Sequence, residues 1–132
     1  MLEGNKKSML VVDDESAIGT IIGIQFDKDY NITIFKNGLE AIKWLLDGNL
    51  PDVIILDLNM PEMNGLEFLK EVRKFNYFKN IPMLVLSGED SSIKRIEAFR
   101  NGANDYLTKP FNPIELRIRM ERFFVMPSLV KS

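Results

Sequence analysis

Five side chains in this sequence have the types needed for chemistry on phosphate groups, and each stands beside the end of a short apolar run. They are Asp13 and Asp14 after "MLVV", Asp57 after "VIIL", Ser87 at the end of "PMLVLS", and Lys109 soon after "DYL". Three carboxylates that lie close together repel one another and raise each other's pKa unless a cation intervenes. Oxygen ligands of this kind select Mg²⁺, with Mn²⁺ or Ca²⁺ able to substitute.

The hydroxyl of Ser87 and the ammonium of Lys109 are suited to hold an anion on the far side of such a metal. Positioning and charge neutralisation provide most of the catalysis in phosphoryl transfer, and an aspartate can itself accept the phosphoryl group as an acyl phosphate. Taken singly, each residue has an ordinary role as a helix cap, a turn residue or a surface ion. Their occurrence together favours one shared site.

Composition narrows the chemistry further. The chain of 132 residues, the size of one domain, has no cysteine and no histidine. Disulfides, thiolate metal sites and an imidazole base are therefore excluded.

The 17 basic and 19 acidic residues give a net charge of −2, so no direct contact with nucleic acid or membrane is expected. The longest aliphatic run, 53–56, is too short to span a bilayer, and the polar start is no signal peptide, so we expect a cytoplasmic protein.

Apolar runs and amphipathic stretches alternate five times along the chain. The expected strands are 9–12, 32–35, 53–56, 82–87 and 105–107, of which the second and fifth look short and weak. Four helices are marked by apolar residues three or four positions apart. Their markers are Ile18, Ile21 and Ile22, with Gln25 at the next position of that pattern; Leu39, Ile42, Leu45 and Leu46; Leu66, Leu69 and Val72; and Ile93, Ile96 and Phe99. This alternation predicts a parallel sheet covered by helices on both faces, with the ligand site at the carboxyl ends of the strands.

Glycine and proline mark several helix ends. Gly48 and Gly102 stand where helix C-termini are expected, and Asn112-Pro113 is typical of an N-cap followed by the first helical residue. The last helix has two apolar stripes: Leu116, Met120, Phe123 and Phe124 form one, and Ile114 and Ile118 form the other. One stripe should face the core. The second either widens the contact with a neighbouring helix or forms a surface for a partner.

The segments "VVDDE", "ILDLNMPEMNGLEFL", "VLSGE" and "GANDYLTKPF" closely resemble the receiver domain of bacterial two-component response regulators. The resemblance implies a flavodoxin-like, doubly wound (βα)5 fold of the α/β class, with a five-stranded parallel sheet in the order 2-1-3-4-5. Residues 8–125 would form the receiver domain. Residues 1–7 would be a flexible N-terminal segment, and 126–132 a C-terminal tail or the start of a linker.

The resemblance also implies a role for each acidic residue. Asp57 would be the phosphoacceptor, which takes its group from a phosphohistidine on a sensor histidine kinase or a histidine phosphotransfer protein. Asp14 would bind Mg²⁺ directly and Asp13 largely through a water. Asp57 and the backbone carbonyl of Asn59 would complete the protein ligands, and Asn59 would also adjoin the phosphoryl group.

On the phosphoryl side, the resemblance assigns Ser87, Lys109 and the backbone N–H of Gly88 as contacts. Lys109 and Pro110 would be joined by a cis peptide bond. Tyr106 would be the switch aromatic, which swings inward when the Ser87 hydroxyl moves toward the phosphoryl group. From the residues alone, a plain half-buried strand residue is the favoured interpretation of Tyr106.

A phosphorylatable switch of this kind needs an output partner. The resemblance implies an output protein or a covalently linked output domain, recognised by a surface that includes Ile114 and Ile118, or a phosphorylation-dependent homodimer. Two rivals come from other classes. A phosphorylation-independent interaction module could keep the fold as a scaffold. A phosphatase of the haloacid dehalogenase type uses a similar site but has a second aspartate where this chain has Asn59. A flavin-binding protein is less consistent still, because no hydroxyl-rich loop follows the first strand.

Overall fold

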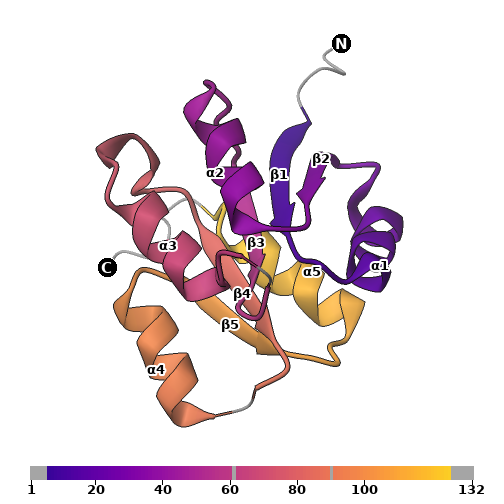
Figure 1. Ribbon diagram of the computed structural model, residues 1–132. Coiled ribbons are helices and arrows are strands. Elements are labelled where there is room, and N and C mark those ends of the chain that lie inside the picture. Colours follow the sequence, from indigo (N-terminus) through magenta and orange to yellow (C-terminus); the bar gives the residue numbers. More distant parts are fainter. Residues whose placement is uncertain (1–5, 61, 90, 126–132) are drawn as a thin grey trace, which may run out of the picture.

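The computed structural model describes residues 6–60, 62–89 and 91–125 (Figure 1). The tail 126–132 and most of the N-terminal segment 1–7 lie outside the described residues. The strands are β1 (Lys7–Val12), β2 (Tyr30–Phe35), β3 (Val53–Asp57), β4 (Met83–Ser87) and β5 (Asp105–Thr108). The helices are α1 (Ser16–Phe26), α2 (Gly38–Leu46), α3 (Gly65–Arg73), the short 3₁₀ helix η2 (Asn76–Phe78), α4 (Ser92–Arg100) and α5 (Pro113–Arg122).

The five strands form one parallel sheet in the order β2-β1-β3-β4-β5, which confirms the predicted fold. Strand β2 is longer than the sequence indicated. It pairs with β1 along six residues, from Lys7 opposite Tyr30 to Val12 opposite Phe35. The prediction missed its first two residues because Tyr30 and Asn31 break the apolar run, although Tyr30 is itself buried.

The sheet lies between two layers of helices (Figure 1). A cluster of buried apolar side chains fills the space on each face. Side chains of α1 and α5, such as Ile22 and Leu116, cover one face, and those of α2, α3 and α4, such as Leu45 and Phe68, cover the other. All residues of β3 and β4 are buried. A strand with both faces covered needs a continuous apolar sequence, which is why these two runs have no polar alternation.

The predicted helix ends are confirmed. Gly48 and Gly102 have φ values of +108° and +110°, a conformation that glycine adopts without steric cost. The Asn112 side chain accepts hydrogen bonds from the N–H groups of Ile114 and Glu115, and Pro113 is the first residue of α5. No helix within the described part of the chain is long and apolar enough to cross a membrane.

Helix α4 is held differently from the others. Its marker residues Ile93, Ile96 and Phe99 identify the helix correctly, but their side chains are 77%, 51% and 42% exposed. Ala98 is the buried residue of this helix. The apolar stripe of α4 therefore faces away from the core.

Candidate functional site

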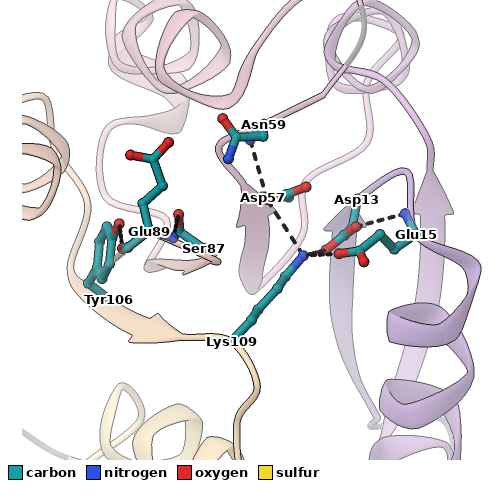
Figure 2. A network of polar contacts seen from close by, with 8 residues as sticks. All are labelled: Asp13, Glu15, Asp57, Asn59, Ser87, Glu89, Tyr106 and Lys109. Carbon is teal, nitrogen blue, oxygen red and sulfur yellow. Dashed lines mark hydrogen bonds and ion pairs between the residues drawn. The ribbon is translucent and has the colours of Figure 1, made fainter. Parts of the chain in front are cut away.

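The carboxyl ends of the strands gather the polar side chains that the sequence singled out (Figure 2). Val12 of β1 is opposite Leu56 of β3, so the residues that follow them, Asp13 and Asp57, stand side by side at the sheet edge. Ser87 is the last residue of β4 and lies opposite Thr108, the last residue of β5. Lys109 directly follows Thr108 in the chain. The register of the parallel sheet thus brings residues from four strands to one place.

Three carboxylates form the acidic part of the site. Oxygen atoms of Asp13, Asp14 and Asp57 all lie within 4.8 Å of one another. Asp13 and Asp57 are 3% and 4% exposed, whereas Asp14 lies at the surface. Hard carboxylate oxygens at this spacing, with one side open to solvent, fit a divalent cation that keeps some of its waters.

Burial and mutual repulsion alter the acidity of this cluster. Burial raises the pKa of Asp57 to about 6, and the charge of Asp13 adds to the increase. The Lys109 ammonium and the hydrogen bond from the Asn59 N–H, at 3.3 Å, act in the opposite direction. Burial also raises the pKa of Asp13. Burial thus disfavours the ionised form of both carboxyl groups, and a bound cation would stabilise that form.

Lys109 is the ammonium at the centre of these acids. Its Nζ donates a hydrogen bond to Asp13 Oδ2 at 3.1 Å and lies 3.6 Å from Asp57 Oδ1. It also donates a hydrogen bond to Glu15. Burial lowers the pKa of Lys109, but the bond to Glu15 and the charges of Asp13 and Asp57 outweigh it, so its pKa is raised overall.

Glu15 is a residue of this site that the sequence reasoning missed. Its backbone N–H donates to Asp13 Oδ1 at 2.9 Å, and its carboxylate accepts from Lys109. The signal was present, because Glu15 follows the Asp13-Asp14 pair at the same strand end.

A second network lies on the opposite side of Asp57 (Figure 2). The Ser87 hydroxyl accepts a hydrogen bond from the Glu89 N–H at 3.1 Å, and the Tyr106 hydroxyl donates to the Glu89 carbonyl at 2.9 Å. Tyr106 is 6% exposed, so its ring is buried and not half-buried. Ser87 and Tyr106 are therefore connected through the backbone of a single residue.

The loops around Asp57 and Lys109 are shaped by their backbones. Asn64 caps α3, since its side chain accepts from the Glu67 N–H while Glu67 bonds back to the Asn64 N–H. Gly65 then packs directly on the Asp57 backbone. The Lys109–Pro110 peptide bond is cis. Gly88 is exposed, and a β-carbon there would meet nothing within 4 Å.

The two apolar stripes of α5 face opposite ways. Leu116 and Met120 are fully buried, with Phe123 and Phe124 packed beside them. Ile114 and Ile118 are 63% and 53% exposed, so they do not widen a contact with a neighbouring helix. Together with the exposed stripe of α4, they leave apolar side chains in solvent on both elements that flank β5.

Comparisons with known proteins agree with this geometry. The family model described as response regulator receiver domain matches residues 9–121. The chain is 40% identical to chemotaxis protein CheY1 of Helicobacter pylori, over 86% of this chain and 93% of that protein. Its fold matches the solved structure of Vibrio cholerae CheY4 with a TM-score of 0.83 and 36% identity, covering 90% and 99% of the two chains. It also matches the Mn²⁺-bound response regulator Rcp1, with a TM-score of 0.77 and 28% identity, covering 88% and 90%.

Other curated relatives are much longer than this chain. It spans 48% of the transcriptional regulatory protein KdpE of Staphylococcus aureus, at 37% identity. It spans only 9% of a histidine kinase, P4 of Formosa agariphila, at 36% identity. The sequence is therefore similar to modules found within larger proteins as well as to proteins of its own length.

Proposed function

The chain belongs to the family of response regulator receiver domains, and on that premise we propose that Asp57 accepts a phosphoryl group from a phosphohistidine in a Mg²⁺-dependent reaction. Receiver domains are signalling proteins and not metabolic enzymes, so the bound group would serve as a signal. The observation that carries the proposal is the Asp57 carboxylate, which is buried beside two further aspartates and lies 3.6 Å from the Lys109 ammonium.

Transfer would form one bond and break another. An Asp57 carboxylate oxygen attacks the phosphorus, and the bond between phosphorus and the donor's imidazole nitrogen breaks. The electron pair stays on that nitrogen, and a proton on the other ring nitrogen makes the leaving group a neutral histidine. Loss of the signal would be the attack of water on the phosphorus, which releases inorganic phosphate and restores the carboxylate. Lys109 is placed to neutralise the charge that collects on the phosphoryl oxygens.

Asp13, Asp14 and Asp57 would hold the metal, together with the backbone carbonyl of Asn59. The fit rests on the donor set, because all three side chains offer carboxylate oxygens, which suit Mg²⁺ and also Mn²⁺ or Ca²⁺. When bound, the cation neutralises the acceptor carboxylate and the incoming phosphoryl oxygens. The Mn²⁺-bound form of Rcp1 supports a divalent ion in this fold.

Ser87, Lys109 and the backbone N–H of Gly88 would contact the phosphoryl oxygens, and Tyr106 would report their presence. The Ser87 hydroxyl accepts from the Glu89 N–H at 3.1 Å and has its own hydrogen to donate to a phosphoryl oxygen. If the side chain rotates to reach the phosphoryl group, its oxygen would move away from the Glu89 N–H. The Glu89 carbonyl also accepts the hydrogen bond from the Tyr106 hydroxyl. A shift of the Glu89 backbone would therefore weaken the hydrogen bond that holds the tyrosine ring in place. A local change of charge would thereby change a surface beside β5.

The partners would be proteins on both sides of this signal. A sensor histidine kinase or a histidine phosphotransfer protein would supply the group, consistent with the kinase among the relatives. An output protein, a linked output domain or a second copy would bind the α4–β5–α5 face, where Ile96, Ile114 and Ile118 are more than half exposed. No direct binding of nucleic acid or membrane is proposed.

The test is intact-protein mass after incubation with Mg²⁺ and a small acyl phosphate. We expect one added phosphoryl group per chain, which disappears in chelator and in Asp57→Asn. An adduct that persists in Asp57→Asn would place the acceptor elsewhere. If no adduct formed and no Mg²⁺-dependent beryllium fluoride complex appeared either, the proposal would fail and the chain would be a phosphorylation-independent module.

A further inference from the structure

Glu15 precedes helix α1, and its side chain binds Lys109 although the start of the helix does not need this contact. It occupies the N-cap position of α1, where Ser, Thr, Asp or Asn is preferred, yet its side chain makes no capping hydrogen bond. The carboxylate turns to the Lys109 ammonium instead (Figure 2). The backbone N–H of Glu15 donates to Asp13 Oδ1 at 2.9 Å, which holds the Glu15 backbone beside the site.

Lys109 is consequently drawn to one side of the site. Its Nζ is hydrogen-bonded to Glu15 and, at 3.1 Å, to Asp13, whereas Asp57 Oδ1 lies 3.6 Å away, beyond hydrogen-bond distance. The two groups that hold the ammonium come from the β1–α1 segment and not from the acceptor strand. A phosphoryl group on Asp57 would have to compete with them for the same ammonium.

We propose that Glu15 is a positioning residue that holds Lys109 on the Asp13 side of the site until a phosphoryl group competes for it. The inference rests on the proposed function of Asp57 and adds to it the residue that restrains the lysine. Glu15 also lines the open hollow that contains Asp57 and Lys109, so a phosphodonor that reaches Asp57 passes beside it.

The size of the effect follows from exposure. The Glu15 side chain is 57% exposed and that of Lys109 is 14% exposed. An ion pair with one partner in solvent is weak, so its loss should change the rate of phosphorylation only about two- to fivefold. The direction is distinctive: removing this restraint should make phosphorylation faster, whereas damage to the site would make it slower.

Two substitutions separate restraint of the lysine from the charge of Glu15. Glu15→Gln removes the charge. Glu15→Asp keeps it, but the shorter side chain withdraws from Lys109 and can cap α1 instead. We expect both variants to have a second-order rate constant for phosphorylation by a small acyl phosphate about two- to fivefold above wild type. The readout is intact mass against time in Mg²⁺.

Glu71→Gln is the matched control, because it breaks an exposed Glu71–Lys74 pair far along α3, and it should behave as wild type. Rates at the wild-type value in both Glu15 variants would overturn the proposal. A faster Glu15→Gln beside an unchanged Glu15→Asp would do the same, since charge alone would then explain it. If wild type took up no phosphoryl group but formed the beryllium fluoride complex, the proposed function would still stand, and without that complex it would fail. In the first case, the affinity for beryllium fluoride, expected to be higher in both Glu15 variants, would decide the role of Glu15.

Discussion

Replacing Asp57 with asparagine should make the metal-free protein more stable at about pH 7, although it removes the proposed phosphoacceptor. The wild-type carboxyl is 4% exposed and its pKa is raised from 3.8 to about 6. At about 1.4 kcal/mol per pH unit, that difference sets an upper limit of about 3 kcal/mol on the cost of ionising this group in the folded state. We expect a gain of about 1–3 kcal/mol in the free energy of unfolding, measured by urea denaturation in chelator.

The gain should depend on pH with a definite sign. Between about pH 4 and pH 6, the folded wild type binds more protons at Asp57 than the unfolded chain does, because burial raises the folded-state pKa. Its stability should therefore fall as the pH rises through this window. Asp57→Asn cannot ionise, so the difference between the two proteins should be small below about pH 4 and complete above about pH 6.

Asp47→Asn provides the control, because Asp47 is an exposed aspartate beside the end of α2. The Asp47→Asn substitution should change the free energy of unfolding by less than about 0.5 kcal/mol, both below about pH 4 and above about pH 6. Mg²⁺ should stabilise wild type more than Asp57→Asn, since the carboxylate that repels its neighbours becomes a ligand. If Asp57→Asn were less stable than wild type in chelator, the ionised Asp57 carboxylate would not destabilise the metal-free fold.

The strand ends of this site were predictable from sequence for a physical reason. A strand buried on both faces must be apolar until it ends, so the first carboxylate after "VIIL" or "MLVV" marks the carboxyl edge. Parallel register then aligns those edges, which places Asp13 beside Asp57 without further information. The side of the site on which the Lys109 ammonium lies could not be predicted, because it depends on the rotamer of an exposed side chain, Glu15.

Hydrogen bonds from a side chain to distant backbone groups were equally unpredictable from the sequence. The Arg73 guanidinium donates to the carbonyls of Phe78, Ile81 and Gly102. It thereby ties the end of α3 to the loops before β4 and β5. Apart from the Asn104 side-chain oxygen at 3.1 Å, its partners are backbone carbonyl oxygens, which every residue possesses. Nothing in the local sequence therefore distinguishes Arg73 from the surface lysine that follows it. Side chain-to-backbone contacts of this kind carry no signal in a single sequence.

Gly65→Ala should be the most damaging single-methyl change near the site. A β-carbon on Gly65 would stand 2.2 Å from the carbonyl oxygen of Asp57 and 2.5 Å from Cα of Leu58. Both contacts are with backbone that is fixed by β3 and by the hydrogen bond from the Gly65 N–H to the Leu58 carbonyl at 2.8 Å. No side chain can move aside, so the start of α3 must shift away from the acceptor. We expect a loss of about 3 kcal/mol or more in the free energy of unfolding, measured by urea denaturation.

The same shift should weaken the metal site, because the Gly65 N–H is bonded to the Leu58 carbonyl at 2.8 Å. Moving the start of α3 would break that bond or pull on the loop that carries Asn59. Mg²⁺ affinity, measured by calorimetry on the folded variant, should fall together with stability. Gly23→Ala is the matched control: Gly23 lies inside α1 with nothing within 4 Å of a β-carbon. It should stabilise the protein by about 0.5–1 kcal/mol, since alanine is the better helix former. A Gly65→Ala variant as stable as wild type would mean that helix α3 does not lie against the acceptor backbone, and the absence of a side chain at position 65 would then need another cause.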